Sequence, residues 1–374
     1  MLGRLYKRIA APIDPFLFAL VALLLAFACF VQLSASPDRI QAQLMNTLIG
    51  LLVMWIAASI PPQRLQHLAV PLYVLGVLLL IAVALFGDSA KGAKRWLNLK
   101  VMRIQPSELL KIGMPLMLAW YFQQREGLLK ARDFFAAIVL LAVPVGLIAK
   151  QPDLGTAILV LSGGLFIIFF AGLSWKLIAP VIIAGIIGVA AIVSAQDQIC
   201  APEVRWPGMR DYQKHRICTL LAPASDPLGK GFHTIQSSIA IGSGGSFGKG
   251  WRNGTQTQLE FIPERHTDFV FAVISEELGL IGNLGLLIAY ILVIGRGLII
   301  AANATSVFSR LLAGALSLSF FTYAFVNMGM VSGILPVVGV PLPLISYGGT
   351  ALVTLCLGLG ILMSIAHNRT FLQS

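Results

Sequence analysis

Residues 261–282 read FIPERHTDFVFAVISEELGLIG, and in them a charged stretch runs directly into a long apolar segment. Asp268 lies where the apolar run begins, and Glu276 and Glu277 lie two turns further on. An ionisable group in or beside hydrocarbon costs roughly 2.5 to 3.5 kcal/mol, so such groups are kept where they face a cavity or a partner. The stretch therefore predicts a membrane-spanning helix with a functional site at its mouth. A charged helix cap, with Thr267 as the N-cap, is the alternative.

The composition excludes an ordinary soluble protein, because 57% of the 374 residues are hydrophobic and only 11% are charged. Apolar runs long enough to cross a bilayer of about 30 Å predict an all-α polytopic membrane protein with about ten transmembrane helices. We expect these helices roughly at 16–34, 41–60, 67–86, 106–122, 133–149, 155–172, 175–194, 268–295, 308–330 and 343–366. The first run lacks a cleavage site and is expected to be retained. One membrane domain, 1–374, then contains one large extracytoplasmic loop, 195–266, between helices 7 and 8.

The distribution of Lys and Arg predicts the orientation in the membrane. With a cytoplasmic amino terminus, the basic residues of the remaining short loops and of the tail also fall on the cytoplasmic side: Arg64, Arg125, Lys130, Arg132, Lys176, Arg296, Arg310 and Arg369. Both termini are then cytoplasmic, and Asp268 faces the extracytoplasmic space. Cys200 and Cys218 lie in the 195–266 loop, where an oxidising environment would allow a disulfide.

One loop departs from this charge rule. Segment 87–105 lies outside in this topology and is nevertheless basic, with Lys91, Lys94, Arg95, Lys100 and Arg103. Cations on this side indicate an anionic ligand such as a lipid phosphate or pyrophosphate; a miscounted helix, which would move the loop inside, is the alternative. Glu108 and Lys111 follow, three residues apart on one helix face. They predict either a structural ion pair or a cavity wall near the same ligand.

Two further segments have sequences typical of corners and non-helical backbone. KQPDLGT, at 150–156, predicts a tight corner at which Asp153 either caps a helix or lines a cavity. Segment 333–350, GILPVVGVPLPLISYGGT, predicts non-helical backbone at the membrane boundary, which survives only when it is buried in protein or lines a watery cavity. We expect it to pack against the helix that begins near Asp268 and to complete one pocket. The glycine-rich run 241–250 does not fit a phosphate loop, and no spacing resembles a zinc site.

The strings GAKRWLNL, QPSELLKIGM, KQPDLGTA, PERHTDFVFAVISEELGLIG and GILPVVGVPLPLISYGGT, in this order, closely resemble the SEDS family (shape, elongation, division and sporulation). The resemblance covers essentially the whole chain and is nearest to the RodA branch; an FtsW-like division polymerase is the alternative. It implies a peptidoglycan glycosyltransferase of the bacterial inner membrane that polymerises lipid II on the outer face for cell elongation and rod shape. The implied partners are a class B penicillin-binding protein and other elongation-complex membrane proteins, and nucleic acid is not among them.

The resemblance also implies roles for individual residues. The essential aspartate of the family, in its HTDF motif, falls on Asp268, the candidate general base for attack by a sugar 4-hydroxyl on a polyprenyl-pyrophosphate donor; such a base contributes about 10² to 10⁴ in rate. The other candidate substrate-binding residues are Lys94, Arg95, Glu108, Lys111, Asp153, Glu264, Arg265 and Ser346. Glu276 and Glu277 are expected to be structural. No cofactor is expected to be required, although a divalent cation, Mg or Mn, between carboxylates and pyrophosphate is compatible with the residues.

Two other classes fit part of the pattern. A lipid II flippase or other transporter would also place charges in a membrane cavity, and a scaffold would use them to contact partner helices. The charges gather on the outer side, however, with no comparable relay toward the cytoplasm. A carboxylate and a basic loop on one face are best explained by a polymerase.

Overall fold

The computed structural model describes residues 12–90, 93–98, 103–125, 127, 129–201, 204, 214, 218–219, 221, 230–262 and 264–370. Within these residues, seven helices are long and apolar enough to cross a membrane: Pro15–Ala35, Pro37–Ala58, Pro62–Phe86, Ala131–Lys150, Val270–Ala302, Val307–Val331 and Gly349–Asn368. The prediction of a mostly helical, polytopic membrane protein is thereby confirmed.

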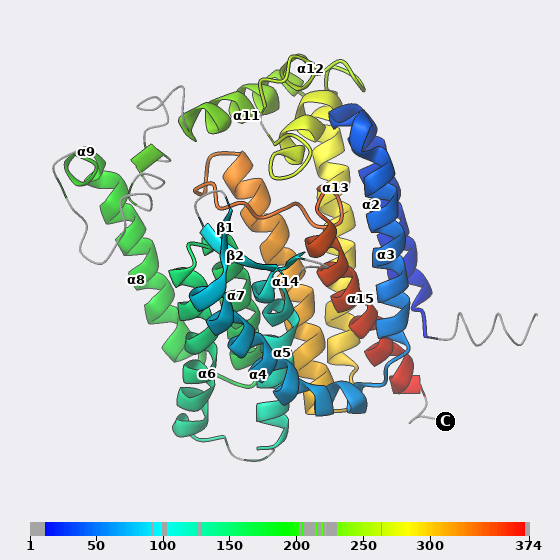
Figure 1. Ribbon diagram of the computed structural model, residues 1–374, viewed down its shortest axis with the longest axis vertical. Coiled ribbons are helices and arrows are strands. Elements are labelled where there is room, and N and C mark those ends of the chain that lie inside the picture. Colours follow the sequence, from blue (N-terminus) through cyan, green and yellow to red (C-terminus); the bar gives the residue numbers. More distant parts are fainter. Residues whose placement is uncertain are drawn as a thin grey trace, which may run out of the picture.

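Most of the long helices form one bundle, α8 (Trp175–Ser194) lies at its edge, and the short helices α11 (Lys230–Gly244) and α12 (Thr255–Gln258) lie across one of its ends (Figure 1). The long helices are α2 (Pro15–Ala35), α3 (Ile40–Ala58), α4 (Pro62–Phe86), α5 (Pro106–Gln123), α6 (Ala131–Lys150), α7 (Leu154–Phe170), α8 (Trp175–Ser194), α13 (Val270–Ala302), α14 (Val307–Val331) and α15 (Gly349–Thr370). The short elements are η1 (Pro37–Arg39), α9 (Gln196–Ile199), α11 (Lys230–Gly244) and α12 (Thr255–Gln258).

Proline and small residues explain several helix starts and contacts. Proline is the first residue of α2, α4 and α5, where its missing N–H costs nothing. A Cβ on Gly360 of α15 would lie 2.3 Å from the Met54 carbonyl oxygen of α3, so these two helices approach closely because position 360 has no side chain. Asp14, just before α2, forms an ion pair with Arg296 near the end of α13. This ion pair ties the start of the chain's first described helix to the core.

The described residues of segment 88–104 are not helical and correct the purely α-helical expectation. It forms a three-stranded antiparallel sheet from β1 (Asp88–Ala90), β2 (Ala93–Asn98) and β3 (Arg103–Ile104), in the order β1-β2-β3. The strands are short and lack a regular apolar alternation, so the usual sequence signal for strands is weak. Lys91 and Lys100 lie outside the described residues.

The 195–266 loop is joined to the bundle at several points. Cys200 and Cys218 form a disulfide, as the sequence allowed. Helices α11 and α12 lie across the end of the bundle (Figure 1). Next to them, the segment 244–250 packs against α13, where Gly279 has a φ of 63° and interrupts the helix. A Cβ on Gly279 would lie 2.3 Å from the Gly248 nitrogen, so only glycine permits this contact.

Glu276 fixes the same loop to α13 through its side chain. Its carboxylate is fully buried and accepts hydrogen bonds from the Lys249 ammonium at 2.9 Å, from the backbone and hydroxyl of Thr257, and from Thr255 and Gln256. The backbone N–H groups of Lys249 and Gly250 donate to the carbonyls of Glu276 and Glu277. These contacts agree with the structural role expected for Glu276.

Candidate active site

A cavity of about 230 Å³ lies where α5, α7, α15 and two non-helical segments meet. The two segments are the turn 264–269, here called the aspartate turn, and the segment 333–348, here called the proline segment. The cavity lining includes four predicted candidates, Glu108, Lys111, Asp153 and Asp268. Its other polar lining residues are Gln105, Thr156, Thr267, Tyr347 and Thr350. The proline segment is non-helical and contributes to this pocket, as predicted.

Asp268 lies in the aspartate turn, directly before α13. The turn is tight because Glu264 has a φ of 52° and its carbonyl accepts from the N–H groups of Thr267 and Phe269. Helix α13 begins at Val270, with Phe269 at the capping position, so the alternative that Thr267 is the N-cap is wrong. The Thr267 hydroxyl instead donates back to Glu264.

The Asp268 carboxylate points toward the proline segment. A Cβ added to Gly339, whose φ is 74°, would lie 3.4 Å from Asp268 Oδ2. The backbone of the proline segment therefore approaches the carboxylate where glycine leaves room. Asp268 thus lies where the aspartate turn meets the proline segment, and its side chain lines the cavity.

Glu108 and Lys111 form a buried ion pair on the α5 wall of the cavity. Lys111 Nζ lies 2.6 Å from Glu108 Oε1, and the Thr354 hydroxyl of α15 donates to the second carboxylate oxygen at 3.2 Å. Lys111 Nζ also lies 5.1 Å from the ring centroid of Tyr323 on α14. The pair predicted from the sequence is present, and it faces the cavity. A cation is therefore available on the same cavity as Asp268.

Asp153 fulfils both of the roles considered for it. Its Oδ1 accepts from the Thr156 N–H at 3.3 Å and caps α7, and its Oδ2 accepts from Gln105 Nε2 at 3.0 Å. It also lines the cavity. Because Gln105 directly follows β3, this bond ties the base of the small sheet to the start of α7.

The remaining candidates lie elsewhere. Arg265 donates to the Ala35 carbonyl at 2.6 Å and pairs with Glu260, and this bond with Arg265 holds the pKa of Glu260 below its ordinary value. Ser346 is buried and hydrogen-bonded to backbone, so it supports the pocket from behind. The Glu264 side chain accepts from Thr267. Lys94 and Arg95 are in β2, but their side chains lie outside what the structure describes.

Sequence reasoning missed several residues of this region. Gln105 and Thr350 line the cavity, and Tyr323 lies beside Lys111. Gln32 and Asn327 are buried amides in apolar helices that contact the aspartate turn. Placing a polar group in hydrocarbon costs free energy, and this argument singled out Asp268 in the sequence. The same argument, applied to uncharged polar residues inside a membrane helix, could have found Gln32 and Asn327.

A larger, mostly apolar groove of about 480 Å³ adjoins the cavity. It lies between α3, α4, α5 and α15, and it shares Gln105, Glu108 and Thr350 with the cavity. Its apolar lining residues include Ile49, Leu72, Leu109, Ile112, Val353 and Leu357. A polar chamber therefore lies beside an apolar groove. Among the residues that the structure describes, no group of three His, Cys, Asp or Glu side chains is arranged to hold a metal ion.

A bundle of membrane-length helices with a charged cavity at one end and an apolar groove beside it defines a polytopic membrane protein that can take an amphiphilic ligand. Residues 14–371 match the FtsW, RodA and SpoVE family, described as cell cycle proteins, and this chain belongs to that family, the SEDS family.

Sequence relatives narrow the comparison further. The chain is 50% identical over 364 residues to the peptidoglycan glycosyltransferase MrdB of Escherichia coli K12, covering 96% of this chain and 95% of the relative. It is 33% identical over 331 residues to the probable peptidoglycan glycosyltransferase FtsW of Geobacter sp. M18, covering 87% and 86%. The similarity to MrdB is thus stronger than the similarity to this FtsW.

Solved structures share the fold. The rod shape determining protein RodA of Thermus thermophilus superposes with a TM-score of 0.68 at 30% identity, covering 95% of this chain and 97% of the other. A chain from a peptidoglycan synthase complex that coordinates polymerization and crosslinking gives a TM-score of 0.77 at 35% identity, covering 95% and 98%.

Proposed function

We propose that this chain is an elongation-type peptidoglycan glycosyltransferase, which polymerises lipid II into glycan strands on the outer face of the bacterial inner membrane. The near full-length identity to MrdB supports this assignment, and the lower identity to FtsW favours elongation over division. The single observation that carries the proposal is the cavity on which Asp268, Glu108, Lys111 and Asp153 converge.

In the proposed reaction, Asp268 is the general base. The 4-hydroxyl oxygen of an acceptor lipid II sugar forms a bond to the anomeric carbon of the growing chain's terminal sugar. The bond from that carbon to the lipid pyrophosphate breaks, and the pyrophosphate leaves with its electron pair. Asp268 accepts the hydroxyl proton, since an alcohol is a poor nucleophile until its proton is removed.

Lys111 would stabilise the departing pyrophosphate with its positive charge, because its side chain lines the same cavity as Asp268. Lys94 and Arg95 are proposed to assist from β2. Their strand belongs to the sheet whose last strand ends at Ile104, and the next residue, Gln105, lines the cavity. The sheet backbone therefore leads directly into the cavity wall.

The apolar groove is proposed to hold the polyprenyl tail. It shares Gln105, Glu108 and Thr350 with the cavity, so a tail in the groove would bring its pyrophosphate to the polar chamber. Burial of hydrocarbon against apolar side chains favours this position, whereas the phosphate requires polar partners. A divalent cation that accompanied the pyrophosphate would be held mainly by the pyrophosphate oxygens, because the described His, Cys, Asp and Glu side chains form no group of three that could hold it.

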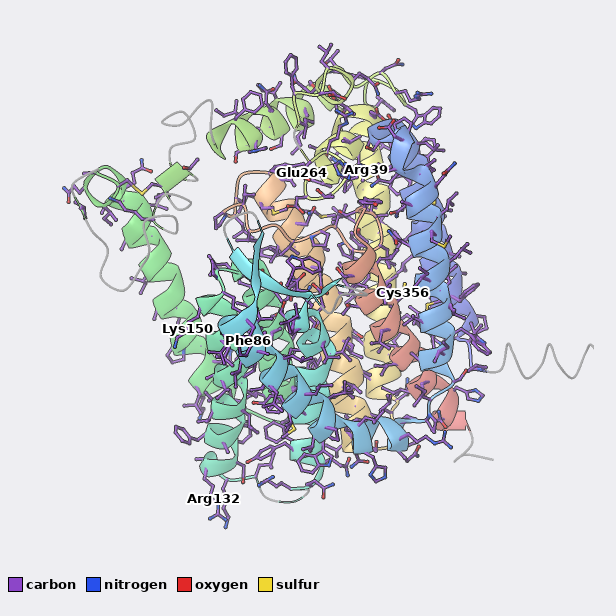
Figure 2. All side chains as sticks on the ribbon, viewed as in Figure 1. Arg39, Phe86, Arg132, Lys150, Glu264 and Cys356 are labelled. Carbon is purple, nitrogen blue, oxygen red and sulfur yellow. A yellow bond between two sulfur atoms is a disulfide. The ribbon has the colours of Figure 1, made fainter. Side chains whose placement is uncertain are left out.

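We further propose that ten helices span the membrane, with both termini cytoplasmic and the 195–266 loop outside. Helices α5, α7 and α8 would join the seven candidate spans. Figure 2 supports this orientation. Glu264, in the 195–266 loop, lies at the α11 end of the bundle, and Arg132, in a loop proposed to be cytoplasmic, lies at the other end. A class B penicillin-binding protein is the proposed partner, since a structural relative belongs to a complex that couples polymerization and crosslinking.

The test is glycan-strand formation from purified lipid II in liposomes, with a class B partner present. Asp268→Asn is compared with wild type and with Asp133→Asn, the same change near Arg132, where Asp133 pairs with Arg125. We expect polymer from wild type and Asp133→Asn and at least 100-fold less from folded, partner-bound Asp268→Asn. Polymer from Asp268→Asn would remove Asp268 from the chemistry. Transport of lipid II without polymer from the wild type would favour a flippase.

A further inference from the structure

Three consecutive backbone carbonyls in the aspartate turn each accept a hydrogen bond from a side chain of a different element. Gln32 Nε2 of α2 donates to the His266 carbonyl at 2.9 Å, and the Ser346 hydroxyl of the proline segment donates to the Thr267 carbonyl at 2.6 Å. Asn327 Nδ2 of α14 donates to the Asp268 carbonyl at 2.9 Å. The last residues before α13 are therefore held by side chains from three directions.

The turn takes its donors from other segments because it precedes the regular helix, and the His266 carbonyl also accepts from the Tyr347 N–H at 2.8 Å. Helix α13 begins at Val270, so the carbonyls of residues 266–268 lie ahead of its repeating hydrogen bonds. A buried backbone carbonyl without a donor costs about 1 to 3 kcal/mol. Gln32 and Asn327 are almost completely buried themselves, with exposed fractions of 1% and 0%. Two buried amides in apolar helices are thus retained beside one turn.

Gln32 and Asn327 also donate to the backbone of the proline segment, and Ser346, which belongs to that segment, bonds within it. Asn327 Nδ2 donates to the Val340 carbonyl at 2.7 Å, and Gln32 Nε2 lies 3.4 Å from the Ile345 carbonyl. Ser346 Oγ accepts from the Leu342 N–H at 2.8 Å. The three side chains therefore connect the aspartate turn to the proline segment. They fix the separation of two walls of the cavity as well as the position of the turn.

We propose that Asn327, assisted by Gln32 and Ser346, is a positioning residue that holds Asp268 in its reactive place; the inference rests on the proposed function of Asp268. Asn327 acts through the backbone and does not touch the reacting atoms. An amide nitrogen has two N–H donors, and here both of its bonds go to carbonyls, one on Asp268 and one on Val340. Asp and Leu of similar size lack these donors, and Ser has only one.

The effect on catalysis follows from geometry. A displacement of about 1 Å at a reacting group costs on the order of 10²-fold in rate. Loss of the Asn327 amide frees the Asp268 carbonyl and separates it from Val340, so the carboxylate loses its fixed place while the lipid-binding groove is unchanged. We therefore expect a fall in kcat with little change in KM.

The experiment compares Asn327→Leu with Thr322→Val in the purified full chain bound to its class B partner. Thr322 is a buried polar residue on the same helix whose hydroxyl donates to Leu318, so its loss tests α14 without touching the turn. We expect kcat for lipid II polymerisation to fall about 10- to 100-fold in Asn327→Leu, with KM within about twofold of wild type. Thr322→Val should keep the wild-type kcat.

A double variant separates positioning from general damage. If Asn327 acts through Asp268, Asn327→Leu should cause no further loss in an Asp268→Asn background. Wild-type kcat in folded Asn327→Leu, or a loss that multiplies with that of Asp268→Asn, would overturn the proposal. Full activity of Asp268→Asn alone would instead overturn the proposed function, so the two failures are distinguishable.

Ser346→Ala provides an independent variant. It removes one hydroxyl, and it leaves the cavity lining unchanged because Ser346 is not among the residues that line the cavity. A positioning role predicts a lower kcat, an unchanged KM and again no added loss with Asp268→Asn. A raised KM with unchanged kcat would show that Ser346 binds substrate and would contradict its part in positioning. This variant keeps the proposal testable if Asn327→Leu does not fold.

Discussion

The ammonium of Lys111 lies 2.6 Å from the carboxylate of Glu108, and both side chains line the cavity that also contains Asp268. The exposed fractions of these two side chains are 6% and 14%, so the ion pair is largely removed from solvent. Removing one member of such a pair leaves an unpaired buried charge, which destabilises the folded chain. Replacing both members by apolar residues leaves no unpaired charge and avoids this destabilisation.

We predict from this pair that Glu108→Leu destabilises the folded chain by about 3 to 5 kcal/mol. The double variant Glu108→Leu/Lys111→Leu should be more stable than Glu108→Leu, because no unpaired charge remains. Thermal unfolding in detergent of wild type, Glu108→Leu, Lys111→Leu and the double variant measures the coupling. Additive losses from the two single variants would contradict a coupled buried pair.

Glu276 and Glu277 allow a matched comparison of neighbouring carboxylates. Glu276→Gln removes the charge that Lys249 contacts and disturbs the bonds from Thr255 and Thr257, so we expect a loss of about 2 to 4 kcal/mol and faster proteolysis within 244–258. Glu277→Gln, whose carboxylate accepts from the Ser34 hydroxyl, should have a smaller effect. Thermal unfolding and limited proteolysis provide the measurements. Equal losses of stability in Glu276→Gln and Glu277→Gln would contradict the role of Glu276 in fixing the loop to α13.

Glycine at position 360 is predicted to be required for the contact between α15 and α3. Gly360→Ala places a Cβ 2.3 Å from the Met54 carbonyl oxygen, so the helices must separate and the melting temperature should fall. Gly295→Ala is the control, since a Cβ there meets nothing within 4 Å. It should be neutral or slightly stabilising because Ala favours helix by about 1 kcal/mol. A lower melting temperature for Gly295→Ala alone would refute this account.

Asp14 should contribute stability that depends on pH. Burial by itself would raise the pKa of Asp14, but the hydrogen bonds and charge of Arg296, together with the backbone hydrogen bonds from Leu17 and Phe16, outweigh burial and hold this pKa below its ordinary value. The carboxylate therefore stabilises the folded chain above the ordinary pKa of about 3.9, and this contribution is lost as pH falls through the lowered folded pKa.

Unfolding measured between about pH 3 and pH 6 checks the Asp14 prediction. The wild type should lose stability toward the acidic end, and Asp14→Asn should be less stable than wild type near neutral pH with a smaller acid-dependent loss. Asp38→Asn, on η1 at the other end of α2, is the control. Parallel pH curves for wild type and Asp14→Asn would contradict the predicted linkage.

Much of the site could be predicted from the sequence because charge and proline are costly in a membrane. Asp268, Glu108, Lys111 and Asp153 were selected by that cost or by their corner sequence, and they line one cavity. The proline segment was expected to be non-helical for the same reason. These predictions depended on local features, which a single stretch of sequence contains.

The contacts that hold the aspartate turn could not be predicted in this way. Gln32 and His266 are separated by 234 residues, and Asn327 and Asp268 by 59, so no local pattern links them. The cap predicted at Thr267 is wrong because the Thr267 hydroxyl donates to Glu264 and does not accept from the N–H groups of a following helix, and α13 starts later, at Val270. The small sheet at 88–104 was missed because its strands are too short to give a periodic pattern.

The interruption at Gly279 is the place where segment 244–257 joins α13. Leu280 and Ile281 donate their N–H groups to the carbonyls of Gly245 and Ser246, and Glu276 is bonded to 249–257. The backbone on both sides of Gly279 is therefore fastened to segment 244–257, and Asp268 lies about two turns ahead of this attachment. Segment 244–257 and the aspartate turn are thus joined through one continuous helix, so a displacement of this segment would be passed along α13 to the backbone next to Asp268.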